Sequence, residues 1–277
     1  MVARRDDPPA VEVGPGVQIL VVIWLLWGVV FGATALVVHV GAPALVVFLC
    51  SYAGVALSTW TAGREASRLA WGRRSVLPCI ALGIATVAAL GRLPPDVLWG
   101  YLHGGVLLTA GAVVGATLGR EVIDPRHVWP LVVVGAAADL WSVMAPAGLT
   151  HAVLEGEGPV ALSTVTLHVP VPNVDGLGIA PVLGLGDVVF TAFLLGAAAR
   201  LALPERRSGV GLAIGFGLCF VGLVVLEVPL PALPFVALSF AAAHGRTLAP
   251  RPRELGLAVA LAAAVFAAGA LLTRAPG

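Results

Sequence analysis

Nine long apolar runs constrain the fold of this chain more than any other feature. A helix needs about 20 predominantly apolar residues to cross the hydrocarbon core of a bilayer. The 277 residues are 59% hydrophobic and only 11% charged, whereas soluble domains are about 25% charged. We therefore expect an all-α polytopic membrane protein with about nine transmembrane helices. The predicted spans are residues 17–39, 42–60, 75–92, 98–118, 128–147, 178–200, 209–228, 231–245 and 254–273.

The arginines predict how these spans are oriented. All 16 basic residues are Arg, and fourteen of them lie at the N-terminus or in alternate loops, on one predicted side of the membrane. Only Arg92 and Arg274 fall on the other side. The positive-inside rule then places the N-terminus in the cytoplasm and the C-terminus and the loop 148–177 outside, in a membrane that we expect to be a prokaryotic plasma membrane. The formal net charge of +1 makes nucleic acid an improbable partner.

The external loop contains a strand pattern. Residues Thr164–Val169 alternate polar and apolar side chains and are rich in β-branched residues. We expect Pro170 and Pro172 to end this strand, and Asp175-Gly176 to form a turn into the next helix.

Two carboxylates lie well inside predicted spans. Asp139 is about twelve residues into its span and Asp187 about nine residues into the next one. A charge at the bilayer centre costs about 2.5–3.5 kcal/mol on insertion scales, so such residues are candidates for function. The two spans are antiparallel, which places both acids at similar depth and lets them face each other and share a proton. Catalysis, a proton relay for transport and a purely structural pair are all compatible with that placement.

Short motifs surround these acids. Gly184-Leu185-Gly186-Asp187 has the form GxGD, and Pro231-Ala232-Leu233-Pro234 contains PAL at the start of a late span. The order of a mid-span Asp, a loop, GxGD and then PAL resembles the GxGD intramembrane aspartyl proteases, the presenilin and signal peptide peptidase group. The resemblance covers roughly residues 130–245, and Ala138 stands where that family has a Tyr before its first catalytic Asp. The orientation predicted from the arginines is that of signal peptide peptidase.

The resemblance implies a presenilin-like bundle and a function. Asp139 and Asp187 would be the catalytic residues of an aspartic endopeptidase that cuts single-span membrane proteins or signal-peptide remnants within the bilayer. The substrate-binding residues would be Gly184, Leu185, Gly186, Pro231, Ala232, Leu233 and Pro234. Neither a cofactor nor a metal is expected, and the sequence does not say whether partner subunits are needed. The predicted division is 1–126 for four N-terminal spans, 127–245 for the catalytic core and 246–277 for an extra span.

The motifs also have a physical interpretation. Glycines before Asp187 let a neighbouring chain approach the backbone closely. Pro231 and Pro234 interrupt the helix start and leave backbone groups free to bind an extended substrate by strand addition. We expect His103 to make packing contacts and His151 and His168 to be solvated. Their spacing does not suggest a metal site, and the three cysteines form no CxxC pair.

Two other functions fit part of the sequence. A prepilin-peptidase-like enzyme also uses a GxGD aspartate, but it usually carries a Lys shortly after the motif, and this chain has no Lys. A proton-coupled transporter would use Asp139 and Asp187 as a relay. Transporters commonly have paired broken helices in two repeated halves, a symmetry that is not evident in this sequence.

Overall fold

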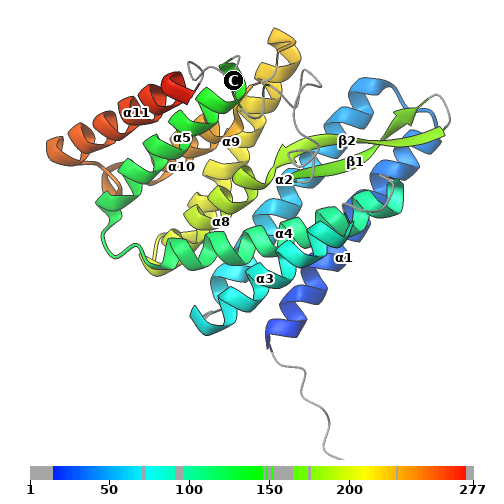
Figure 1. Ribbon diagram of the computed structural model, residues 1–277, viewed down its shortest axis with the longest axis horizontal. Helices are drawn as coiled ribbons and strands as arrows, with labels where there is room; N and C mark the ends of the chain where they lie inside the picture. The colour runs from blue at the N-terminus through cyan, green and yellow to red at the C-terminus, as the bar shows by residue number, and fades with distance from the viewer. Residues whose placement is uncertain are drawn as a thin grey trace, which may run out of the picture.

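The computed structural model describes residues 15–69, 73–90, 96–145, 148, 151, 165–173, 176–228 and 230–272. Most of these residues are helical. The α-helices in this part of the chain are α1 (Pro15–His39), α2 (Ala44–Arg68), α3 (Arg73–Leu90), α4 (Val97–Arg120), α5 (Val128–Met144), α8 (Leu185–Arg200), α9 (Glu205–Leu226), α10 (Ala232–His244) and α11 (Pro252–Leu272). Short 3-10 turns, η1 (Pro125–His127) and η2 (Gly245–Thr247), precede α5 and follow α10. Figure 1 shows how these helices pack side by side.

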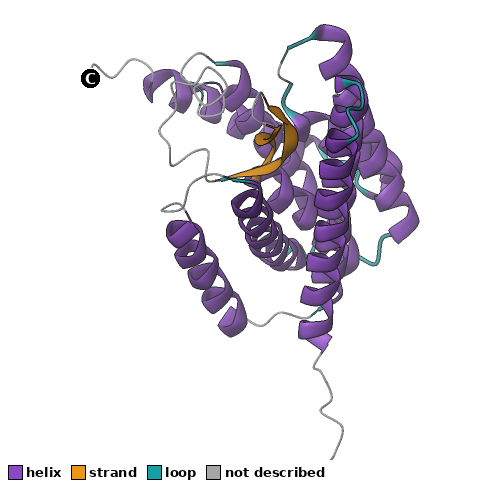
Figure 2. Cartoon of the chain, turned by 90° about the vertical axis from the view of Figure 1, so that its right-hand side faces the viewer, coloured by secondary structure: helices purple, strands orange, loops and turns teal. Residues whose placement is uncertain are grey.

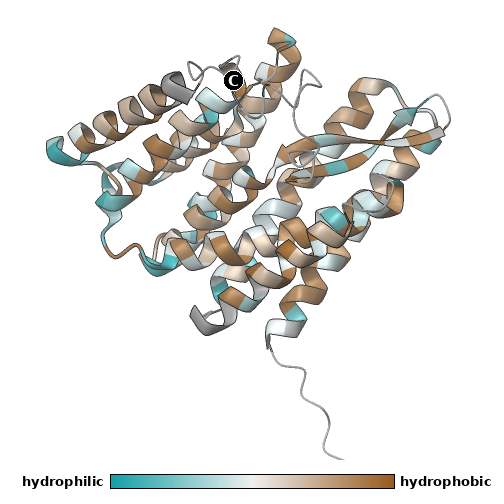
Figure 3. Ribbon diagram, viewed as in Figure 1, coloured by the Kyte–Doolittle hydropathy of each residue, from teal (hydrophilic) through white to brown (hydrophobic). Residues whose placement is uncertain are grey.

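The helices are those of a membrane protein. Five of the nine predicted spans are supported by the length and composition of the observed helices. Each of the nine predicted runs overlaps one described α-helix. Five helical segments are long and apolar enough to cross a bilayer: Gln18–His39, Ala44–Arg68, Val97–Arg120, Pro125–Met144 and Glu205–Leu226. In Figure 3 hydrophobic residues run along the helices and hydrophilic residues gather toward their ends. Helix α8 has 16 residues and α10 has 13, both fewer than the ~20 that a straight crossing needs.

A β-hairpin departs from the all-helical expectation. Strand β1 (Thr166–Asn173) pairs antiparallel with β2 (Gly176–Gly184), with an irregularity between Leu167 and His168. The prediction that Pro170 and Pro172 end the first strand was wrong, because β1 continues through both. Both prolines fit in a two-stranded hairpin because an edge strand does not need every N–H. The hairpin lies toward the end of the bundle opposite the start of α1 (Figures 1 and 2). Thr164 and Asp175 lie outside the described residues.

The second strand also corrects the sixth predicted span. Residues 178–184 are the end of β2, and the helix begins only at Leu185. An uninterrupted apolar run does not by itself distinguish a buried strand from a helix. Here Pro181 and the glycines of the run disfavour helix, and the paired strand satisfies the backbone groups instead.

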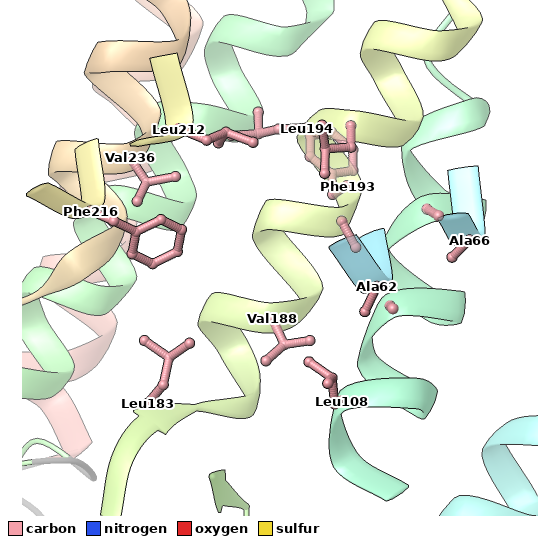
Figure 4. Close-up of a cluster of buried hydrophobic side chains, with 14 of the residues drawn as sticks. Ala62, Ala66, Leu108, Leu183, Val188, Phe193, Leu194, Leu212, Phe216 and Val236 are labelled. Carbon is pink, nitrogen blue, oxygen red and sulfur yellow. The ribbon is translucent and has the colours of Figure 1, made fainter. Parts of the chain in front are cut away.

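Helix α8 is the central element of the bundle. Eight successive residues, Thr191–Ala198, are buried, so this helix is enclosed around its whole circumference. Its neighbours include α4, α2, α9, α10 and α5. In Figure 4 Val188 of α8 points toward Leu108 of α4, while Leu212, Phe216 and Val236 gather on another side of the helix. A carboxylate on α8 is therefore held by the core of the protein.

Glycines allow α4 and α8 to touch along their backbones. A Cβ atom on Gly115 would come within 2.0 Å of the Val189 carbonyl oxygen, and one on Gly119 within 2.1 Å of the Phe193 carbonyl oxygen. Gly111, Gly115 and Gly119 recur every four residues, the small-residue spacing that lets membrane helices approach closely. This contact fixes the position of α8, and with it the position of Asp187.

Candidate active site

Asp139 is bound by the PAL segment. It is the twelfth residue of α5 and is partly buried. Its Oδ2 atom accepts a hydrogen bond of 2.9 Å from the backbone N–H of Leu233. That N–H lies in the first turn of α10, where backbone donors lack a partner within the helix and the helix dipole favours a negative charge. The start of α10 therefore supplies a hydrogen-bond donor to the Asp139 carboxylate.

Asp187 lies in the first turn of α8. It is the third residue of that helix rather than about nine residues into a span, because β2 occupies the preceding segment. Its Oδ2 atom accepts a hydrogen bond of 3.1 Å from the backbone N–H of Gly184. The other oxygen, Oδ1, is buried and has no hydrogen-bond partner among the described residues. One oxygen thus positions the carboxylate while the second is left available for a proton or a ligand.

The two carboxylates belong to one site. Helix α5 contacts α8, and α10 contacts both. Asp139 lies close enough to Asp187 for their charges to interact. Residues 139, 187 and 233, far apart in the sequence, are therefore brought together around the N-terminal ends of α8 and α10.

The PAL segment begins α10 in the way its prolines suggest. Pro231 is the N-cap residue with extended backbone, and Ala232, Leu233 and Pro234 form the first turn. Proline is compatible with a first turn because the N–H it lacks would have no helical partner there. Pro231, Ala232 and Leu233 are buried and Pro234 is partly buried. The segment thus combines a rigid start with one backbone donor aimed at Asp139.

The GLGD segment joins the hairpin to α8. The Leu185 N–H donates a hydrogen bond of 2.8 Å to the Val165 carbonyl oxygen, beside the start of β1. Gly184 ends β2 and also contacts Asp187 through the hydrogen bond above. Gly186 is exposed, and a Cβ atom on it would meet nothing within 4 Å. The protein's own packing therefore does not require glycine at position 186, and the space beside it is open.

Tyr52 and Cys219 are neighbours of the site that the sequence alone did not indicate. Tyr52 of α2 and Cys219 of α9 both lie within electrostatic reach of Asp187. Tyr52 contributes a hydroxyl group from another helix, whereas position 138, beside the first aspartate, is an exposed Ala. A single Tyr in an apolar run carries no signal of its own, so only the packing of α2 against α8 identifies it.

The prediction for His168 was wrong. This residue of β1 is only 6% exposed, and burial lowers the pKa of His168 to about 4. Its ring packs edge-on against Trp99, with 5.2 Å between centroids, and lies 5.8 Å from the ring of His103. His103 is itself stacked on Trp99 at 4.3 Å, in line with the packing role expected for it. These aromatic contacts attach the hairpin to α4.

Metal-ligating side chains do not cluster among the residues that the structure describes. No group of three or more His, Cys, Asp or Glu side chains is placed to hold an ion in this part of the chain.

No protein-family model, curated protein or solved structure gives a significant match to this chain. Membership in the GxGD protease group therefore stays a hypothesis that rests on the motifs and their geometry.

Proposed function

We propose that the protein is an intramembrane aspartyl protease in which Asp139 and Asp187 hydrolyse peptide bonds within transmembrane segments. The observation that carries the proposal is the hydrogen bond from the Leu233 N–H to Asp139. It connects the first candidate aspartate with the PAL segment, 94 residues away along the chain. Helix α10, which begins with the PAL segment, also contacts α8, which carries the GxGD aspartate. A purely structural Asp139 would not require these two segments to meet beside it.

The proposed reaction needs water and two carboxyl groups. One ionised carboxylate removes a proton from water while the second, protonated carboxyl donates its proton to the scissile carbonyl oxygen. The water oxygen bonds to the carbonyl carbon to give a diol. The first carboxyl then passes its new proton to the nitrogen as the C–N bond breaks, and one hydroxyl of the diol returns its proton to the second carboxylate. The free Oδ1 of Asp187 provides a position for the shared proton.

The hairpin supplies a rationale for substrate binding. A transmembrane substrate hides its peptide bonds within its own helix, so it must be extended before it can be cut. An extended segment that added to the exposed edge of a strand would regain backbone hydrogen bonds, as strand addition does elsewhere. Strand β2 leads directly to Asp187, and the open space beside Gly186 leaves room for a second backbone.

The proposal also includes the finer features of topology. We infer nine crossings, a cytoplasmic N-terminus and an external hairpin. The distribution of arginines supports this orientation. The 16 residues of α8 cover about 24 Å, so its crossing would begin directly at the external hairpin.

A cleavage assay tests the proposal. Purified protein in detergent is incubated with a single-span substrate, and the products are mapped by mass spectrometry. We expect a cut within the apolar segment of the substrate. An inert protein that instead conducts proton-coupled flux in liposomes would contradict the proposal and favour the relay function.

A further inference from the structure

A groove between α2 and α9 has neither candidate catalytic aspartate in its lining, although Tyr52, a neighbour of the candidate site, forms part of its wall. It has a volume of about 920 Å³ and is lined along most of its length by aliphatic and aromatic side chains. Leu49 and Phe220 lie toward one end, and Arg64, Glu205 and Arg206 toward the other. The groove is therefore amphipathic along its axis, with its charged groups confined to one end.

The length of the groove matches one leaflet of a membrane. Leu49 and Arg64 are fifteen residues apart on α2, which corresponds to about 22 Å of helix. Half of a bilayer, including the headgroup region, measures about 20–22 Å. A crossing helix about 10 Å wide and 30 Å long would occupy roughly 2,400 Å³, far more than the groove provides.

The charged end has an excess of positive charge. Arg64 forms an ion pair with Glu205, and Arg68 contacts Glu65 at 2.9 Å. Arg206 is exposed and makes no ion pair within the described part of the chain, and the exposed Arg207 follows it. The acidic partners at this end are already engaged, so the guanidinium of Arg206 remains to bind an anion.

We propose that this groove binds one anionic phospholipid, with an acyl chain along the apolar wall and the phosphate against Arg206. A phosphate group offers the planar guanidinium a charge-assisted hydrogen bond that a zwitterionic headgroup, with its own cation, satisfies less well. The site goes beyond the proposed protease function and does not depend on it, because lipid binding is measured without a substrate.

Native mass spectrometry of the purified full chain, titrated with phosphatidylglycerol or phosphatidylcholine, tests this site. We expect one retained phosphatidylglycerol, and weaker retention of phosphatidylcholine. Arg206→Gln should weaken phosphatidylglycerol binding roughly tenfold or more, the scale of one lost charge-assisted hydrogen bond. The matched control is Arg200→Gln, which removes an exposed arginine outside the groove lining and should leave binding unchanged.

A second pair of variants tests the apolar wall. Ala213 lines the groove and is exposed, so Ala213→Trp should fill the groove and abolish retention of the lipid. Leu218 is 52% exposed on the same helix outside the lining, and Leu218→Trp should have no effect. Equal binding by either variant and its control, equal retention of the two lipids, or displacement of the lipid by a single-span peptide would overturn the proposal.

Discussion

A single backbone donor links two parts of the candidate site. The Leu233 N–H reaches the carboxylate of Asp139, and Leu233 itself is 7% exposed. We predict that Leu233→Pro lowers the cleavage rate by about ten- to a hundredfold, because a hydrogen bond to a charged group is worth about 1.5–3 kcal/mol. Proline suits the first turn of a helix, so the loss would be mainly that of the donor. The rate is measured on a single-span substrate.

Leu233→Ala is the matched control for this prediction. It removes most of the buried side chain and keeps the N–H. If the alanine variant loses as much activity as the proline variant, the side chain matters and the hydrogen bond does not, which would contradict the assigned role.

Among single residues, the sequence singled out the two carboxylates but did not give the exact position of Asp187. Asp139 and Asp187 stand out because carboxylates are costly in apolar runs. The position of Asp187 in a first turn was missed, since the Leu and Val residues before it suit a helix or a buried strand equally. The burial of His168 was missed because it depends on Trp99, 69 residues earlier in the chain.

The position of Asp187 depends on the contact between helices α4 and α8. We predict that Gly115→Ala destabilises the protein by at least about 1–3 kcal/mol, the usual cost of overpacking, because its Cβ would lie 2.0 Å from a backbone oxygen. The midpoint of thermal unfolding in detergent measures this. Gly32→Ala in α1 is the control, since a Cβ there meets nothing within 4 Å, and it should be neutral or slightly stabilising. Equal midpoints for the two variants would refute the close contact.

The hairpin should be sensitive to acid. The pKa of His168 in the folded protein, about 4, lies below its ordinary value of about 6.5. Between these pH values the unfolded segment binds a proton that the folded segment excludes, so stability falls as the pH is lowered. We predict faster hydrogen exchange of β1 amides at pH 5 than at pH 7.5, after correction for intrinsic rates. His168→Phe should remove this difference, and its persistence would assign the effect to another group, such as His103.

The existence of most helices followed from the sequence, whereas their packing did not. The run Gly111, Gly115 and Gly119 indicates close helix contact but does not say which helix is the partner. The strand β2 was hidden because its sequence, GLGIAPVLG, is apolar throughout and has no alternating pattern. Its pairing with β1 is a long-range property that local composition does not encode.

The arginines predict the orientation of the whole molecule, and this prediction can be measured. We predict that Cys introduced at Asn173, at the hairpin end of β1, reacts with a membrane-impermeant thiol reagent in intact cells. Cys introduced at Ile123, which is 73% exposed beside η1, should react only after permeabilisation. Both variants are made in a background without Cys50, Cys79 and Cys219. The reverse pattern would invert the assigned topology.

The whole molecule has the fold of a helical membrane protein. Its proposed protease function requires that both Asp139 and Asp187 take part in cleavage. The most direct measurement compares cleavage of a single-span substrate by the wild type, Asp139→Asn and Asp187→Asn, with the folded state of each confirmed by thermal unfolding. Asparagine keeps the shape of the side chain and cannot exchange the proton, so each variant should lose at least about a hundredfold in rate. Wild-type protein that cuts within the apolar segment, beside two folded and inactive variants, is the predicted result. A folded variant that cuts at the wild-type rate would contradict the two-aspartate mechanism.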